Sequence, residues 1–317
     1  MRYTFAALLF ALAGWGEDGH RIIAQAAWPH LAARLRHAFA DDAAAFVRAC
    51  NEPDARKHRE PAEGARHYVD IERWSDEFLA LARRARSKAE LSRLYQLSWP
   101  PAADQIGRLY SGVPTRLQDY ERWRGEVSDD DLGTIFYAVS ERTGALQAAL
   151  AAGDDAGVVR AAGDLCHYVG DLTQPLHNTA NYRGQFSGNA ICQHSVHERY
   201  ESEMVRRFAR ELARRVGAEL AHAPPPSSEG PAEPTGRAIA ASRRAYSRLP
   251  ALLAADREVL PDQTACERMR PADWAAGLYR ALGQLTALEL ADAVRLLAEL
   301  AAPRASPRPR PAPARGD

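Results

Sequence analysis

Residues 167–177 have the sequence HYVGDLTQPLH, and the spacing within this stretch predicts both local structure and chemistry. His167 and Asp171 are four positions apart, so a helix places them on one face. Pro175 ends that helix, and His177 follows on the turn beyond it. An imidazole and a carboxylate on one helix face are typical zinc ligands, and a second imidazole just after the helix can reach an adjacent metal ion. The stretch therefore predicts a helix that ends at a metal site.

Apolar residues on both sides of this stretch mostly recur at helical spacing, and no segment alternates between apolar and polar positions convincingly enough to predict a sheet. Helices are expected over residues 18–39, 128–151, 155–172, 198–220, 236–249 and 271–301. The second of these begins with SDDD, which is a good N-cap and first turn, and ends just before Gly153. The fold class is therefore predicted to be all-α, with a single multi-helical domain over residues 15–302.

Two proline-rich segments interrupt the helical pattern. Residues 221–236, AHAPPPSSEGPAEPTG, are expected to form an exposed loop inside the domain, because their prolines break helices. Residues 303–317, PRASPRPRPAPARGD, form a proline-arginine tail that cannot build a core and is expected to be disordered.

Composition places the chain among ordinary globular proteins. It has 317 residues, of which 46% are hydrophobic, and its 41 basic and 41 acidic side chains balance. Zero net charge argues against a highly basic protein that binds polyanions, and it gives no global electrostatic case for binding nucleic acid or membranes. We expect a monomer.

The first 14 residues, MRYTFAALLFALAG, have the pattern of a secretory signal peptide. Arg2 precedes an apolar run of about ten residues, which is too short to cross a bilayer and ends in small residues. The alternative is a buried N-terminal helix. No other stretch is apolar enough to span a membrane, so the sequence predicts a soluble, secreted or periplasmic protein without stable membrane insertion.

Four cysteines fit an exported protein: Cys50, Cys166, Cys192 and Cys266. In an oxidising compartment they can form two disulfides, with three possible pairings. A free buried thiol is an equally good interpretation of Cys166, which lies in an apolar helical context. Because no two cysteines form a Cys-x-x-Cys pair, a cysteine zinc site is not expected.

A second group of candidate ligands lies in residues 191–204, ICQHSVHERYESEM. It contains two overlapping pairs at helical spacing, His194 with Glu198 and His197 with Glu201. Either pair offers one nitrogen and one oxygen to a second metal ion. The alternative is the solvated, charged start of a helix.

Counting the best candidates gives more ligands than one ion needs: His20, Asp54, His67, His167, Asp171, His177, His197 and Glu201. Nitrogen and oxygen ligands without thiolates suit catalytic zinc with open coordination positions. Several divalent ions held close together are typical of phosphoester hydrolysis. The sequence therefore predicts a multinuclear site.

Four motifs occur in a fixed order: WGEDGH from Trp15, HYVD from His67, HYVGDLTQPLH from His167 and HERYE from His197. Together they resemble the superfamily of zinc-dependent phospholipases C and fungal single-strand-specific nucleases. The likeness runs from Trp15 to about Glu203. It implies an all-helical fold that binds three zinc ions at the bottom of a cleft.

The resemblance also implies three sets of zinc ligands: Asp54, His67, His167 and Asp171; His177, His197 and Glu201; and Trp15 with His20, which share Asp171 as a bridge. Trp15 would contribute its α-amino nitrogen and carbonyl oxygen. Asp54 is also the implied general base. The pair His197 and Glu201 fits the family pattern better than the alternative pair, since the aromatic Tyr200 directly precedes the acid.

A free α-amino group on Trp15 requires cleavage of the signal peptide between Gly14 and Trp15. Ala11 and Ala13 occupy the favoured small-residue positions for cleavage one bond earlier, which would leave Gly14 as the first residue. An extra glycine would turn the amine into an amide and weaken the third site. We expect cleavage before Trp15, because the chemistry of the family requires it.

Two branches of the superfamily differ in their substrates. Glu201 and the pair Asn181-Tyr182 are more similar to the phospholipase branch, whereas the five-residue step from Trp15 to His20 is nuclease-like. The resemblance thus implies a phospholipase C-like enzyme that cleaves at a phospholipid headgroup. The alternatives are a nuclease or 3′-nucleotidase acting on single-stranded nucleic acid or nucleotides, and a non-catalytic exported protein that keeps zinc only for structure.

Overall fold

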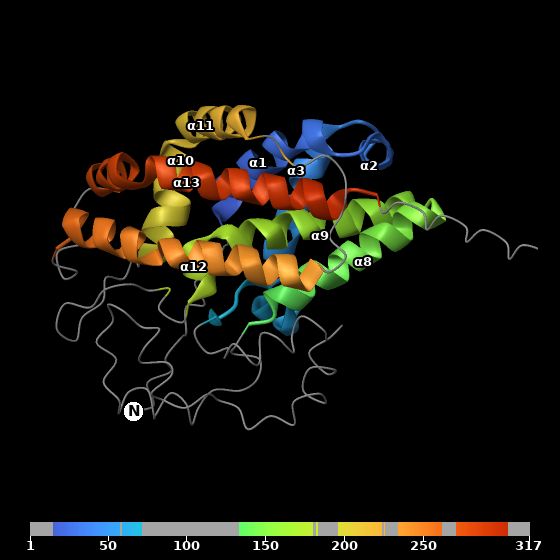
Figure 1. Cartoon of the computed structure of the whole chain (residues 1–317), viewed down its shortest axis with the longest axis horizontal. Helices are drawn as coiled ribbons and strands as arrows, with labels where there is room; N and C mark the ends of the chain where they lie inside the picture. Colours follow the sequence, from blue (N-terminus) through green and yellow to red (C-terminus); the bar gives the residue numbers. More distant parts are fainter. Residues whose placement is uncertain are drawn as a thin grey trace, which may run out of the picture.

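The computed structural model describes residues 15–57, 59–71, 133–179, 182, 196–223, 225, 234–261 and 271–303. Within these ranges every regular element is a helix, which confirms the all-α prediction (Figure 1). One hydrophobic core extends from Trp15 to Ala301, so these segments form a single domain. The expected signal peptide, residues 304–317 of the tail and His194 lie outside the described residues.

In the described part of the chain the α-helices are α1 Gly16–Ala27, α2 Ala33–Ala38, α3 Ala43–Arg56, α8 Ile135–Ala152, α9 Asp155–Thr173, α10 Val205–Arg207, α11 Ala209–His222, α12 Pro234–Val259 and α13 Pro271–Ala301. The 3₁₀ helices within the described ranges are η1 Trp28–His30, η2 Pro61–His67 and η5 Pro175–Asn178. The π-helix η6 covers Glu198–Met204.

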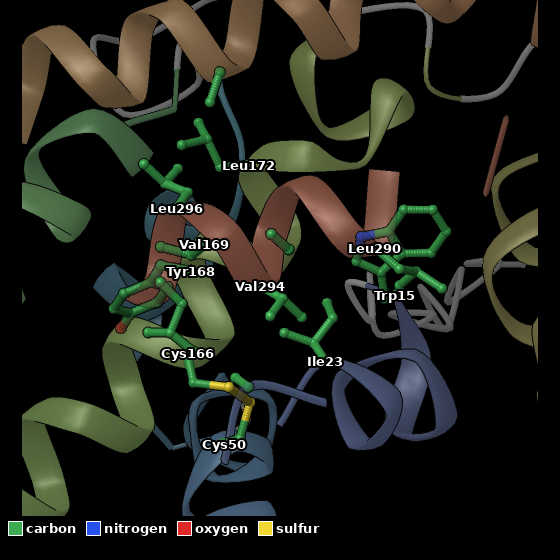
Figure 2. Close-up of a cluster of buried hydrophobic side chains, with 14 of the residues drawn as sticks. Trp15, Ile23, Cys50, Cys166, Tyr168, Val169, Leu172, Leu290, Val294 and Leu296 are labelled. Carbon is green, nitrogen blue, oxygen red and sulfur yellow. A yellow bond between two sulfur atoms is a disulfide. The ribbon is translucent and has the colours of Figure 1, made fainter. Parts of the chain in front are cut away.

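Helix α9 is the central element of the domain. Every residue of its second half, from Ala161 to Thr173, is buried. It contacts α8, α3, α13, α12 and α1, and Figure 1 shows α12 and α13 running side by side across it. In the core, Val169 and Leu172 of α9 pack near Val294 of α13 (Figure 2). A helix buried around its whole circumference belongs to the interior, so the residues of HYVGDLTQPLH lie deep in the molecule.

Two glycines let neighbouring helices approach α9 closely. A Cβ atom on Gly163 would lie 2.6 Å from the Cβ of Ala49 in α3. A Cβ atom on Gly170 would lie 2.9 Å from Nδ1 of His20 in α1. Both distances are shorter than packed side chains tolerate, so glycine at these positions fixes how near α3 and α1 lie to the central helix.

A disulfide between Cys50 and Cys166 joins α3 to α9, and Figure 2 shows the bond between the two sulfur atoms. The Cα atoms are 5.5 Å apart and both residues are buried. The bond excludes the free-thiol interpretation of Cys166 and selects one of the possible pairings. Cys192 and Cys266 lie outside the described residues.

The predicted helix over residues 18–39 is wrong as a single element. The chain leaves α1 after Ala27, passes through η1 and enters α2 at Ala33. Pro29 lies at this break, where its missing N–H and fixed φ interrupt an α-helix.

The predicted helix over residues 128–151 starts too early. Gly133 has a left-handed φ of 76°, and the helix begins at Ile135, whereas residues 128–132 lie outside the described residues. Its end is confirmed, because Gly153 caps the helix with a left-handed φ of 71°.

Other boundaries differ in detail. The predicted helix over 198–220 begins as the π-helix η6 and is interrupted at Phe208 before α11. The expected loop over 221–236 is too long, because α11 runs to His222 and α12 starts at Pro234. Proline is tolerated in the first turn of a helix. The helix over 155–172 is confirmed to within one residue, and the one over 271–301 has its predicted bounds.

Among the described residues, none of the helices combines the length and the apolar character needed to cross a membrane.

Candidate metal centre

The end of α9 and the following turn place three of the predicted ligands. His167 and Asp171 lie on one face of α9, and the helix ends at Thr173. Gln174 then caps η5, its side chain accepting a hydrogen bond from the backbone N–H of Leu176. This turn carries His177 back toward the helix end, as the position of Pro175 predicts.

Nitrogen and oxygen atoms of eight predicted ligands converge in three groups. Within each group the potential ligand atoms lie within 4.8 Å of one another. The groups are His20, His167 and Asp171; Asp54, His67 and His167; and His177, His197 and Glu201. All of these residues are buried except Asp54, whose side chain is 23% exposed.

The carboxylate of Asp171 lies between the first two groups. Its Oδ1 is 3.1 Å from Nε2 of His20, and its Oδ2 is 2.8 Å from Nδ1 of His67. The same Oδ1 is 4.0 Å from Nδ1 of His177, a member of the third group. This position is consistent with the bridging role that the resemblance implies. His167 belongs to the first two groups, and its ring stacks on His20 with ring centroids 3.9 Å apart. The resemblance implies His167 as a ligand in one set only.

The third group contains the preferred pair from the second motif. Nε2 of His197 is 2.7 Å from Oε2 of Glu201, and Nε2 of His177 is 3.3 Å from the same oxygen. Gln174 also donates a hydrogen bond to this oxygen at 2.8 Å. Of the two overlapping pairs, the structure therefore brings His197 and Glu201 to His177, and Glu198 is not a member of the group.

Trp15 lies fully buried immediately before α1, five residues ahead of His20. Its ring is 5.6 Å from the ring of Tyr200, and its carbonyl oxygen accepts a hydrogen bond from the N–H of Gly19 at 3.2 Å. The residue thus sits at the start of the helix that carries one candidate ligand and against the element that carries another. Metal binding by its amino and carbonyl groups stays a prediction.

Backbone carbonyls fix the orientation of two imidazoles. Nδ1 of His167 lies 2.8 Å from the carbonyl oxygen of Cys50, and Nδ1 of His177 lies 2.7 Å from the carbonyl oxygen of His67. A carbonyl can only accept, so each Nδ1 carries a proton and each Nε2 is directed at the other candidate ligands. Hydrogen bonds of this kind orient histidine ligands at metal sites.

The donor atoms in the groups fit divalent cations. Within the described part of the chain, Nε2 of His20, Oδ1 of Asp171 and Nε2 of His197 are buried without a hydrogen-bond partner. Yet His197 approaches Glu201 to 2.7 Å, which is a close contact without hydrogen-bonding geometry. Leaving a buried polar group unsatisfied costs about 1–3 kcal/mol. Imidazole nitrogens and carboxylate oxygens are ligand types that zinc accepts, so the residues present fit this ion.

Burial and neighbouring charges shift the pKa values of three candidate histidine ligands. Burial lowers the pKa of His20 to about 4, with a further contribution from His167. Burial and the nearby Lys57 lower the pKa of His197 to about 3. Both rings are therefore neutral at physiological pH, with lone pairs available. Burial opposes the charge on His167 as well, but Asp171 and Asp54 outweigh it and raise the pKa of that ring to about 10.

Lys57 is a functional candidate that the sequence did not predict. Its Nζ lies 2.6 Å from Oδ1 of Asp54, and its side chain is only 11% exposed. It brings a nearly buried positive charge to the most exposed of the candidate ligands. The available sequence signal is its position three residues after Asp54, which is common in helices and carries little information alone.

No model of a known protein family matches this chain, and no curated protein matches it. The likeness to the phospholipase C and nuclease superfamily therefore depends on the four motifs. Histidines and carboxylates of these motifs lie close together in the fold.

Proposed function

We propose that this chain is an exported zinc-dependent phosphodiester hydrolase that resembles phospholipase C and holds three zinc ions. The observation that carries the proposal is the position of Asp171, whose two oxygens face different histidines within two adjoining ligand groups. The third group lies beside them, since His177 is within 4.0 Å of the same carboxylate. Such a constellation of nitrogen and oxygen donors suits several divalent ions, which are typical of phosphodiester hydrolysis.

Zinc bound there would supply Lewis acidity, which activates water and neutralises the charge that grows on phosphate oxygens. Asp54 is the candidate that orients the attacking water, because it is the ligand residue most open to solvent. Burial would raise its pKa, but His167 and Lys57 outweigh this effect and hold the pKa well below its usual range. Asp54 is therefore ionised at neutral pH and accepts hydrogen bonds.

Lys57 offers a positive charge to the substrate beside Asp54. Its ammonium group lies against Asp54, and three donors allow it to contact a phosphate oxygen while it keeps that ion pair. We assign it the role of holding the phosphate next to the water that Asp54 orients. A positive charge in a partly desolvated site is most effective when it is fixed before the reaction starts.

Phospholipase C-like specificity is supported by Glu201, which is the acid of the third group and has the residue type of that branch. A single-strand nuclease or 3′-nucleotidase is the second candidate, supported by the five-residue step from Trp15 to His20. An exported protein that uses zinc only for structure is the third. Closed, thiolate-rich sites are typical of structural zinc, and the three groups contain no cysteine.

A panel of substrates tests these candidates on the zinc-loaded mature protein. It compares phosphatidylcholine, single-stranded DNA, single-stranded RNA and a 3′-nucleotide. Release of phosphocholine without cleavage of the nucleotides is the expected result. Cleavage of the nucleotide substrates alone would assign the chain to the nuclease branch. Hydrolysis of none of them, with zinc bound, would favour the structural role.

A further inference from the structure

Glu63, Arg56 and Tyr168 form a polar cluster next to Nε2 of His67, whereas Nδ1 of the ring faces Asp171. Glu63 is buried one turn before His67, and its Oε1 is 3.4 Å from Nε2 of that ring. The hydroxyl of Tyr168 donates a hydrogen bond to the same oxygen at 2.5 Å, and Nη2 of Arg56 contacts it at 3.3 Å. The carboxylate of Glu63 is thus held in place from two other elements.

The surrounding ion pairs connect the elements that carry the Asp54, His67 and His167 group. Arg56 of α3 also donates to Asp164 of α9 at 2.8 Å. Arg66 of η2 donates to the hydroxyl of Tyr168 at 3.1 Å. Tyr168 follows His167 directly in α9, Arg56 follows Asp54 by two residues, and Arg66 directly precedes His67. The side chains of Arg56 and Tyr168 that contact Glu63 therefore come from α3 and α9, and Glu63 itself lies in η2. These three elements also carry Asp54, His167 and His67.

The ring of His67 is turned the opposite way from the other two oriented imidazoles. Its Nδ1 is 2.8 Å from Oδ2 of Asp171, 3.0 Å from Nε2 of His167 and 3.8 Å from Oδ1 of Asp54. This nitrogen therefore faces the other donors. The proton then belongs on Nε2. That nitrogen is buried without a hydrogen-bond partner in this structure, and its 3.4 Å contact with Oε1 of Glu63 lacks hydrogen-bonding geometry, so Glu63 is the acceptor nearest to an unsatisfied donor.

We propose that Glu63 is a positioning residue of the zinc centre, which accepts the Nε2–H of His67 and so presents Nδ1 of that ring to the ion shared with Asp54 and His167. This inference rests on the proposed zinc centre, and it adds a residue that none of the four motifs contains. A carboxylate behind an imidazole ligand fixes its tautomer and makes it a better donor, and removing one typically lowers metal affinity about 10–100-fold.

Zinc affinity in competition with a chelator tests the proposal on Glu63→Ala and Glu63→Gln. Alanine is expected to weaken one of the three ions about 10–100-fold, with a smaller loss for glutamine, whose amide oxygen still accepts a hydrogen bond. Glu60→Gln is the matched control, because Glu60 is exposed and lines a surface pocket that Glu63 also lines. Unchanged affinity of all three ions in Glu63→Ala would overturn the proposal.

The tautomer of His67 in the zinc-loaded wild-type protein gives a test that needs no stable variant. Imidazole ¹⁵N spectra, assigned by His67→Asn, are expected to show a proton on Nε2 of His67 and on Nδ1 of His167 and His177. In Glu63→Gln only the His67 signals are expected to shift. A proton on Nδ1 of His67 in the wild type would overturn the proposal, as would a uniform shift of all three rings.

The two proposals fail in different ways. A protein that binds three zinc ions, shows the expected tautomer and hydrolyses no phosphodiester would refute the hydrolase and leave the role of Glu63 in place. A hydrolase whose zinc affinity does not depend on Glu63 would refute the positioning role alone.

Discussion

Gly170 is the residue that lets His20 approach the central helix. A Cβ at this position would lie 2.9 Å from Nδ1 of His20 and 3.0 Å from Cδ1 of Ile23, both in α1. Gly170→Ala is therefore expected to push α1 away from α9 and to remove the ion held by His20, which metal analysis would show as one zinc fewer per chain. Thermal unfolding should also begin at a lower temperature, since overpacking costs about 1–3 kcal/mol.

The matched control is Gly144→Ala in the exposed face of α8, where no atom lies within 4 Å of the added Cβ. Alanine there is expected to stabilise the helix by about 0.5–1 kcal/mol without changing the zinc content. Full zinc occupancy in Gly170→Ala would refute this view of the packing around His20.

Asp171 faces two ligand groups at once, so its loss should affect more than one ion. Asp171→Ala is expected to remove two of the three zinc ions, as measured by metal analysis of the folded protein. Asp155→Asn is a suitable control, because Asp155 starts the same helix and pairs with Arg34 at the surface. Loss of a single ion would show that the carboxylate does not bridge.

Residue positions in the centre were predictable to different extents. The approach of His167 to Asp171 follows from their spacing of four, which any helix converts into proximity. Asp54 lies in another element, so its approach to the histidines could not be derived from their spacing in the sequence. Glu63 and Lys57 became visible only in the fold, because their partners come from packing between α3, η2 and α9.

At the scale of elements, α3 is the helix that the sequence did not predict. Its stretch Ala43–Arg56 contains Pro53, which normally opposes a helix interior, and few large apolar residues. Asp42 nevertheless caps its start by accepting a hydrogen bond from Ala44, and packing on α9 stabilises the rest. Tertiary contacts can override weak local propensity, and here they place Asp54 at the centre.

The disulfide ties α3 to α9 next to the group that contains Asp54. Cys50 also offers its carbonyl oxygen to Nδ1 of His167, the residue that follows Cys166. Replacing both cysteines by alanine is expected to lower the free energy of unfolding by about 2–5 kcal/mol. Zinc affinity should fall as well, because the bond that orients His167 loosens.

Urea denaturation and chelator competition would measure these two effects on the double variant. An unchanged denaturation midpoint would refute the stabilising role of the disulfide. A lower midpoint with unchanged zinc affinity would show that the orientation of His167 does not depend on it.

The π-helix η6 could not be predicted from periodicity. Its buried contacts come from distant helices, since Arg199 pairs with Asp256 of α12 and Tyr200 donates to Glu289 of α13. Residues 198–204 have an ordinary helical pattern in the sequence, whereas these long-range contacts accompany a wider turn around Glu201. Such π turns frequently occur at functional sites.

For the whole molecule, Glu289 links stability to pH. Burial raises the pKa of its carboxyl well above the usual range, although Tyr200 and Arg248 act in the opposite direction. The folded state therefore keeps a proton that the unfolded chain releases above about pH 4.5. Stability from this group is complete below that pH and is lost as the pH rises toward the folded pKa.

Glu289→Gln is expected to flatten the fall in the free energy of unfolding between about pH 5 and pH 8, because glutamine does not titrate and still accepts a hydrogen bond from Tyr200. Denaturation of both proteins across this range measures the difference. The same pH dependence in both proteins would refute a protonated Glu289.

The overall fold was predictable as a class but not as an arrangement. Helical periodicity and the absence of alternating segments predicted an all-α domain, which the structure confirms. Periodicity does not indicate which helices pair, so the central position of α9 and the approach of α1 and α3 to it depend on contacts between distant residues, including Gly163 and Gly170.

The central claim is that bound zinc makes this chain a phosphodiester hydrolase. Its most direct test is the hydrolysis of bis(4-nitrophenyl) phosphate by the mature protein, measured before zinc removal, after it and after zinc is restored. We predict that hydrolysis stops when the metal is removed and returns once three zinc ions per chain are bound again. A fully zinc-loaded protein that leaves this diester and the natural substrates intact, or one that hydrolyses them equally well without metal, would contradict the claim.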